Sequence, residues 1–210
     1  MRSGTCAMRL FMVLATMRLG GVILKFIGTR PIKTERLILR KITPDDAEDM
    51  YNNWTSDRNV TKYLTWKPHS SLDQTKTVIG FWVYEGNKDD SFRWCIELKE
   101  SGQVIGDISV VELHKEQDAC EIGYCLAPPY WSRGIMTEAL CAVRDYLLFK
   151  AEIKHIEARH QLGNHASGRV MEKSGMRYEG IEPKAGKDNE GVACDMAVYS
   201  IWTCDWKSPE

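Results

Sequence analysis

A turn between an apolar strand and an amphipathic helix constrains this chain more than any other feature. The segment 119–140, ACEIGYCLAPPYWSRGIMTEAL, begins as an apolar strand, passes through Pro128 and Pro129, and enters a helix after Arg133 and Gly134. The first N–H groups of a helix lack intrahelical acceptors and lie at the positive end of its dipole, so they attract phosphate oxygens. Glycine keeps a Cβ out of the approach path, and arginine adds positive charge. The segment predicts a site for a nucleotide-containing ligand.

Two common phosphate-binding motifs are absent from the sequence. No string fits the P-loop pattern G-x-x-x-x-G-K-[ST], and none fits the dinucleotide fingerprint G-x-G-x-x-G. Residues 131–136, WSRGIM, instead resemble the acetyl-CoA pyrophosphate loop of the GNAT acetyltransferase superfamily, Q/R-x-x-G-x-G/A. Trp131 stands where Gln or Arg is usual, and Met136 where Gly or Ala is usual. The context Y-W-S-R-G-x-x-T-E-A resembles the RimJ/RimL-like branch more closely, where Trp at the first position is familiar.

Further segments resemble the same branch, in the same order along the chain. They are an opening strand, TERLILR (34–40), a loop between two early helices, YLTWKPH (63–69), a second CoA-contacting segment, NHASGRVMEKSG (164–175), and a closing strand, DMAVYSI (195–201). Each is weak alone. Their order and spacing identify the chain as a member of the GNAT superfamily.

Hydrophobic patterning predicts one mixed α/β (α+β) domain. We expect strands at 36–41, 92–98, 103–113, 119–126, 154–158, 176–181 and 192–202, a helix beginning after Thr43, and helices at 71–84, 134–150 and 164–174. The resemblance implies a GNAT-like, mostly antiparallel twisted sheet of six to seven strands flanked by helices, over residues 31–207. Residues 1–30 are expected to be an extension, either disordered or produced by a start codon assigned too early. Its apolar run, Leu10–Met17, is too short to span a bilayer.

Composition limits the partners. The formal charge is 28 − 29 = −1, so there is no global basic field for nucleic acid. The apolar content is 43 %, and we expect no membrane partner. Seven cysteines without a C-x-x-C pattern favour neither a zinc site nor a secreted disulfide framework. We therefore expect a reduced, cytoplasmic protein without a metal. The resemblance suggests a homodimer, although the residues themselves leave the oligomeric state open.

The resemblance implies direct acetyl transfer from acetyl-CoA, as co-substrate, to a primary amine on a small molecule or a protein N-terminus. The backbone of Tyr124, Cys125 and Leu126 would hold the pantetheine arm and polarise the thioester carbonyl. Within that strand, Gly123 indicates a bulge or a close backbone approach. The residues expected to hold the rest of the cofactor are Trp131, Ser132, Arg133, Gly134, Ile135, Met136, Thr137, Asn164 and Ser167.

The sequence leaves more than one assignment open for the catalytic residues. Glu121 occupies the position of the general base in histone-acetylating relatives, and the competing interpretation is a structural carboxylate paired across the sheet. Ser167 is a candidate to contact CoA or to protonate the leaving thiolate, with Tyr124 and Tyr199 as rival acids. Asn164 is expected to contact pantetheine, to cap its helix, or both.

On the acceptor side, Trp66 and His69 are the expected pocket residues, since Trp66 lies in a loop next to Lys67 and Pro68. Two other functions remain open. One is a catalytically silent acyl-CoA-binding module, which Met136 favours if its side chain distorts the phosphate cradle. The other is a thiol-dependent hydrolase that uses Cys120 or Cys125.

Overall fold

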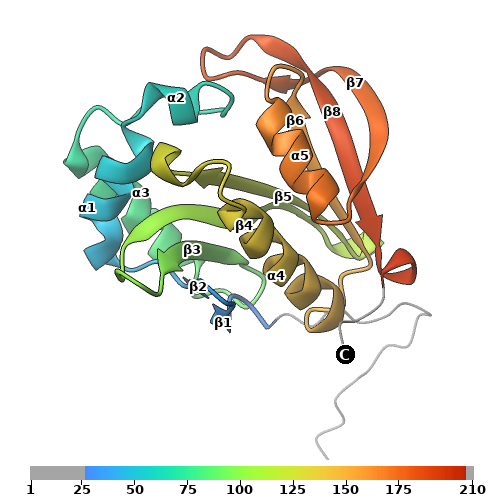
Figure 1. Ribbon diagram of the computed structural model, residues 1–210, viewed down its shortest axis with the longest axis horizontal. Coiled ribbons are helices and arrows are strands. Elements are labelled where there is room, and N and C mark those ends of the chain that lie inside the picture. Colours follow the sequence, from blue (N-terminus) through green and yellow to red (C-terminus); the bar gives the residue numbers. More distant parts are fainter. Residues whose placement is uncertain (1–26, 207–210) are drawn as a thin grey trace, which may run out of the picture.

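Eight strands form one sheet in the computed structural model, which describes residues 27–206 (Figure 1). Their spatial order is β1-β2-β3-β4-β5-β6-β8-β7, and β5 and β6 form the parallel pair in an otherwise antiparallel arrangement. The expected mixed, mostly antiparallel sheet is confirmed. It has one strand more than the seven expected because a two-residue strand, β1, pairs with the opening strand.

The element boundaries follow the expected pattern closely. The strands are β1 (Ile32–Lys33), β2 (Leu37–Arg40), β3 (Arg93–Leu98), β4 (Val104–His114), β5 (Ala119–Leu126), β6 (His155–Gln161), β7 (Arg177–Lys187) and β8 (Ala193–Trp202). The helices are α1 (Ala47–Met50), α2 (Arg58–Thr61), α3 (Leu72–Glu85), α4 (Ile135–Phe149) and α5 (His165–Lys173). A π-helical turn extends α1, and β7 continues well beyond its expected end, so the loop before β8 is shorter than expected.

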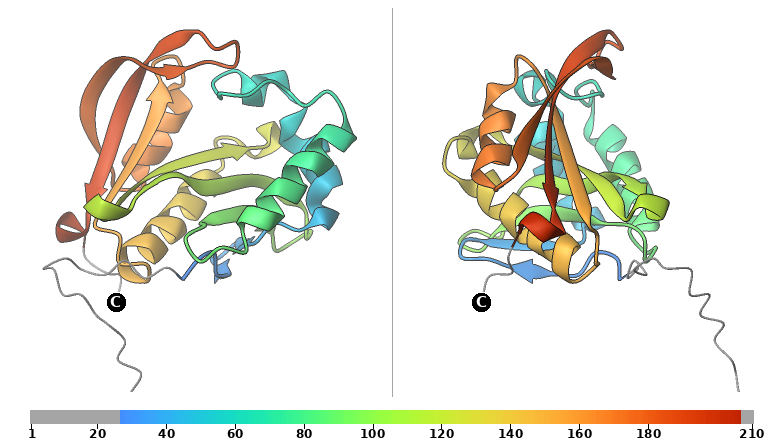
Figure 2. Two further views of the ribbon diagram at one scale, coloured as in Figure 1. Left: turned by 180° about the vertical axis from the view of Figure 1, so that it is seen from behind. Right: turned by 90° about the vertical axis from the view of Figure 1, so that its right-hand side faces the viewer.

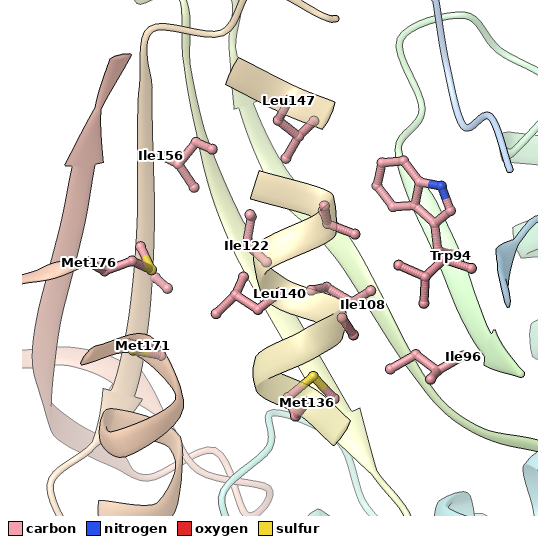
Figure 3. Packing of buried hydrophobic residues seen from close by; sticks show 14 of the residues in the cluster. Trp94, Ile96, Ile108, Ile122, Met136, Leu140, Leu147, Ile156, Met171 and Met176 are labelled. Carbon is pink, nitrogen blue, oxygen red and sulfur yellow. The ribbon is translucent and has the colours of Figure 1, made fainter. Parts of the chain in front are cut away.

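Helices cover both faces of the sheet (Figures 1 and 2). The helices α4 and α5 pack on one face, where Leu140 of α4 meets Ile122 of β5 and Ile156 of β6 in the larger core cluster (Figure 3). The helices α1 and α3 cover the β2–β4 half of the other face, where Met50 and Ile79 belong to a second buried cluster. Each fully buried aliphatic side chain of this kind contributes about 1.5–3 kcal/mol. The β5 strand contributes Cys120, Ile122 and Leu126 to the larger cluster, and its Cys125 packs against the smaller one.

Residues 27–30 fall in the expected extension, but they pack on the domain. Thr29 Oγ1 donates to the Ser91 carbonyl (3.1 Å), and the Arg30 carbonyl accepts a hydrogen bond from Trp94 Nε1 (2.7 Å). The expectations for residues 1–26 lie outside the described residues. Within the described part of the chain, no helix combines the length and apolar character needed to cross a membrane.

Candidate active site

The parallel strands β5 and β6 separate partway along their length. They pair only from Ala119 with His155 to Ile122 with Ala158, although β5 continues to Leu126 and β6 to Gln161. The second half of β5 therefore has no partner strand on this side, and a gap opens between the two strands (Figure 1). Such a gap exposes backbone N–H and C=O groups that a ligand can bind.

The pairing of β5 with β4 decides which backbone groups reach this gap. In an antiparallel ladder, residue pairs that exchange hydrogen bonds alternate with pairs that do not. The Ala127 N–H bonds the Ile105 carbonyl (2.8 Å), so with the observed register the bonded pairs include Cys125. The backbone groups of Tyr124 and Leu126 therefore point away from β4 and toward the gap. Of the three expected pantetheine-binding residues, the geometry favours these two.

Gly123 is required by a close approach, and the bulge lies on the neighbouring strand. The register of β4 and β5 shifts between Val110 and Glu112, which leaves Val111 as the extra residue on β4. A Cβ on Gly123 would lie only 2.8 Å from Val111 Cγ1. The expected irregularity is therefore present beside Gly123, but β4 carries the additional residue.

The turn before α4 has the form that the sequence predicts for a phosphate cradle. Ser132 and Gly134 both have left-handed backbones, with φ of 59° and 75°. No side chain caps the start of α4, so the first N–H groups of the helix, at Ile135, Met136 and Thr137, are left for a ligand. Arg133 is exposed beside them.

Trp131 belongs to the architecture of this turn. Its indole Nε1 donates to the Leu126 carbonyl (2.7 Å), which connects the turn to the end of β5. The Leu126 carbonyl is thereby occupied, so its N–H is the group left to face the gap. Trp131 thus positions the turn against the strand, in addition to any contact with the cofactor.

Met136 does not obstruct the cradle. Its side chain is 5 % exposed and points into the core between α4 and the sheet (Figure 3). Only its backbone faces the ligand end of the helix. The Met136 side chain therefore gives no reason to expect a distorted phosphate turn or a catalytically silent protein.

Across the gap, α5 meets β5 through Tyr124. The Tyr124 hydroxyl donates to the Ser167 carbonyl (3.1 Å) and lies 2.9 Å from Ser167 Oγ. Burial raises the pKa of Tyr124, and the hydrogen bond with Ser167 opposes this only in part. Asn164 Oδ1 accepts from the Ser167 N–H (3.4 Å), which is the expected cap, while its amide Nδ2 makes no hydrogen bond within the described residues.

Tyr199, the other candidate acid, is engaged elsewhere. Its hydroxyl donates to Glu172 Oε1 (3.2 Å), and burial, followed by this carboxylate, raises its pKa. The buried His160 ring also lies here, with Nε2 only 2.7 Å from the position of a Cβ on Gly168. No sequence pattern had indicated this packing. Tyr124 with Ser167 is therefore the pair that lies at the gap itself.

Glu121 lies on the face of the sheet opposite α4, because its neighbours Cys120 and Ile122 belong to the α4 core. Its Oε2 is 3.4 Å from Arg159 Nε, and Arg159 also binds Glu157 (3.0 Å). Burial raises the pKa of Glu121, and the positive charge of Arg159 opposes the rise. A raised pKa suits a general base, whereas the ion pair fits a structural carboxylate, so both interpretations agree with the geometry.

Trp66 and His69 pack together with ring centroids 5.5 Å apart. His69 is buried, and its Nδ1 is 2.8 Å from Thr75 Oγ1, so this ring contributes to local structure; burial lowers its pKa. Trp66 is half-buried against the smaller core cluster. Their role toward a substrate stays a prediction.

Two contacts join the loop before α3 to the β7–β8 hairpin. Lys67 Nζ is 2.7 Å from Glu190 Oε2, and Asn189 Nδ2 donates to the Thr61 carbonyl (3.0 Å). We name residues 61–67 and 188–192 the acceptor rim, because the first segment contains Trp66, which the sequence predicts as a pocket residue. No local pattern in the sequence predicted this contact, because its halves lie far apart along the chain.

The two candidate nucleophilic thiols are poorly suited to attack. The Cys125 thiol donates to Asp107 Oδ1 (2.8 Å), and burial, followed by this carboxylate, raises its pKa well above the ordinary value. Burial also raises the pKa of Cys120. Because the thiolate is the reactive form, the geometry argues against a thiol-dependent hydrolase.

This geometry agrees with the acetyltransferase resemblance: β5 leads to a left-handed turn and to the uncapped start of α4, and the parallel strand β6 separates from β5. The sequence matches the family described as "Acetyltransferase (GNAT) domain" over residues 36–177. The chain belongs to this family. It is an N-acetyltransferase, and its RimJ/RimL-like character agrees with its relatives.

Three similar proteins place the chain within the family. The uncharacterized N-acetyltransferase YoaA of Bacillus subtilis (strain 168) is 31 % identical over 170 residues, which covers 81 % of this chain and 95 % of YoaA. The [ribosomal protein uS5]-alanine N-acetyltransferase of Escherichia coli (strain K12) is 24 % identical over 185 residues, or 83 % of this chain and 92 % of that enzyme. The crystal structure of a GNAT-family acetyltransferase from Bacillus anthracis superposes with a TM-score of 0.72 at 29 % identity, covering 83 % of this chain and 99 % of that one.

Proposed function

We propose that this N-acetyltransferase moves an acetyl group from acetyl-CoA directly to a primary amine in a ternary complex, with a protein N-terminus as the first acceptor to test. The observation that carries the proposal is the gap between β5 and β6 that ends at the uncapped, left-handed turn before α4. The E. coli relative, named for uS5 alanine, supports a protein N-terminus as acceptor. A small-molecule amine is the other acceptor class.

The residues present fit acetyl-CoA. Gly134 has no Cβ, and its left-handed backbone begins a helix whose first N–H groups have no side-chain cap. These groups and Arg133 suit a pyrophosphate, and the backbone edge of Tyr124 and Leu126 suits an amide-containing arm. Acetyl-CoA supplies the activated acetyl group as a thioester. The chain orients it and handles the protons.

The proton-transfer roles fall to groups on opposite sides of the sheet. We assign Glu121 to receive a proton from the acceptor ammonium, directly or through water, because its raised pKa moves it toward the range of a useful base. We assign Tyr124 to donate a proton to the leaving sulfur, with Ser167 hydrogen-bonded behind it. A phenol is protonated at neutral pH, as a general acid requires, and the support for this role is its position at the gap, because burial raises its pKa and makes it a weaker proton donor.

Calorimetric titration with acetyl-CoA, followed by free-thiol release across an amine panel, tests this function. The panel contains short peptides with free N-termini, the same peptides with blocked N-termini, and polyamines. We expect binding, and thiol release only with the free N-terminal peptides. Release only with polyamines would replace the acceptor class, binding without release would favour a silent module, and no binding would contradict the proposal.

A further inference from the structure

Arg36, at the start of β2, reaches the phosphate turn from a distant part of the chain. Its Nη1 donates to the Arg133 carbonyl (2.9 Å), and its Nε donates to Glu138 Oε2 (2.6 Å). Arg133 belongs to the turn, and Glu138 lies in the first turn of α4. One guanidinium therefore joins both halves of the cradle to the edge of the sheet.

Glu138 is fixed by three donors from the β1–β2 turn. The Thr34 hydroxyl (2.5 Å) and the Arg36 backbone N–H (2.9 Å) donate to its Oε1, in addition to the Arg36 side chain. Burial alone would raise the pKa of Glu138, but these hydrogen bonds outweigh it and hold the pKa below its ordinary value. The carboxylate therefore stays ionised and anchors Arg36 beside the turn.

The bond to the Arg133 carbonyl has a geometric consequence for the cradle. The Arg133 C=O and the Gly134 N–H belong to one planar trans peptide, so they point in opposite directions. When Arg36 holds the carbonyl, the Gly134 N–H must point away from the guanidinium. The donor that opens the phosphate site thus has a fixed direction before any ligand arrives.

The remaining nitrogen of Arg36 lies at the cradle itself. A Cβ on Gly134 would be 3.6 Å from Arg36 Nη2, and this nitrogen makes no hydrogen bond within residues 27–206. The Arg36 side chain is 42 % exposed, and Nη2 lies on the Cβ side of Gly134.

We propose that Arg36 is a positioning residue of the acetyl-CoA pyrophosphate site: it fixes the Arg133–Gly134 peptide and thereby the direction of the Gly134 N–H. This inference rests on the proposed function, because it assumes that residues 131–137 bind acetyl-CoA. The ion pair between Arg36 and Glu138 leaves little net charge, so Arg36 acts chiefly by hydrogen bonding and by orienting the peptide before Gly134. Lysine cannot reproduce both bonds of the fork.

The test compares Arg36→Met with Lys99→Met. Lys99 Nζ donates to the Thr34 and Glu35 carbonyls, so it holds the same β1–β2 turn without touching residues 131–138. The dissociation constant of acetyl-CoA is measured by calorimetry for wild type, Arg36→Met, Arg36→Lys and Lys99→Met. We expect about a tenfold rise for Arg36→Met and a smaller rise for Arg36→Lys. For Lys99→Met we expect less than about a twofold change.

A second donor separates positioning from general damage. S-Acetylpantetheine carries the same thioester but no pyrophosphate, so its kcat/KM should be equal for wild type and Arg36→Met, while that for acetyl-CoA falls about tenfold. Equal losses with both donors, or acetyl-CoA affinity in Arg36→Met matching that of Lys99→Met, would overturn the role of Arg36. Failure of the wild-type protein to bind acetyl-CoA would instead overturn the proposed function, and the inference with it.

Discussion

The turn before α4 and the acceptor rim are each held to a distant part of the chain, but in different ways. At the phosphate end, Glu138 is only 16 % exposed and accepts hydrogen bonds from Thr34 and Arg36. At the acceptor rim, Lys67 and Glu190 are each 64 % exposed and form a single ion pair. Exposed pairs contribute about 0–1 kcal/mol, whereas buried, hydrogen-bonded carboxylates are costly to disturb. The proposed acetyl-CoA turn is thus held by a network of hydrogen bonds, whereas the contact at the proposed acceptor rim is exposed and more easily altered.

The largest expected effect tests whether core and cradle are separate. Met136→Ala removes a side chain that is 5 % exposed and should lower the free energy of unfolding by about 2–5 kcal/mol. Since the side chain points away from the ligand, the affinity for acetyl-CoA should stay within about twofold. Denaturant unfolding and calorimetry measure the two quantities. Leu140→Ala on the same helix is the matched control, and a large affinity change confined to Met136→Ala would place this side chain in the cradle.

The next effect concerns proton transfer on the acceptor side. Glu121→Gln should lower kcat by about 10²-fold and remove the acidic limb of the pH–rate profile, because a base must be deprotonated to act. Burial raises the pKa of Glu121, so in the wild-type protein this limb should lie above the ordinary glutamate range. An acidic limb that persists in Glu121→Gln would show that this carboxylate is structural.

Stability gives an independent check on the same carboxyl group. A carboxyl whose pKa is raised by folding stabilises the protein fully below its unfolded pKa, and this contribution is lost as pH rises through the folded pKa. Glu121→Gln should therefore flatten the decline in melting temperature between acidic and neutral pH. Glu100→Gln, at an exposed residue in the turn between β3 and β4, serves as the control and should leave the decline unchanged.

Gly134→Ala examines the cradle without altering its charge. The left-handed backbone at φ 75° costs a residue with a Cβ about 1–2 kcal/mol, and the added methyl would lie 3.6 Å from Arg36 Nη2. We expect the acetyl-CoA dissociation constant to rise about tenfold. Gly102→Ala is the matched control, since it has φ 70° in a turn with no atom within 4 Å of the new Cβ. Equal affinities in the two variants would mean that nothing approaches Gly134 closely.

The same contrast explains what could be predicted from the sequence. The turn before α4 depends on consecutive residues, so Gly134 and the helix start were visible in the local pattern. The anchor of this turn was not visible, because Arg36 and Glu138 lie 102 positions apart and each resembles an ordinary surface charge. The burial of the Met136 side chain was likewise not visible, because it depends on which side of α4 packs against the sheet.

The strand irregularity shows a similar limit. A glycine inside a strand indicated a bulge or a close backbone approach; a bulge lies beside it on β4, and the group that approaches it is the Val111 side chain. The pattern could not decide which strand carries the extra residue, because that depends on the register of β4 against β5. The acceptor rim was missed for the same reason, since Asn189 and Thr61 are 128 positions apart. Local backbone chemistry is readable from sequence, whereas contacts between distant loops are not.

The smallest expected effect is at the acceptor rim. Lys67→Ala and Glu190→Ala, measured singly and together, should show a coupling energy of about 0.2–1 kcal/mol in stability, decreasing with salt because both groups are exposed. Each change should alter KM for the acceptor peptide by more than it alters the acetyl-CoA dissociation constant, because the rim lies away from the phosphate turn. The ion pair between Glu85, the last residue of α3, and Lys88, which follows the helix, provides a control cycle of the same chemistry. If the rim variants instead weaken acetyl-CoA binding as strongly as Arg36→Met does, the turn before α4 and the acceptor rim form one coupled unit, and the division between a fixed donor site and an adjustable acceptor border is wrong.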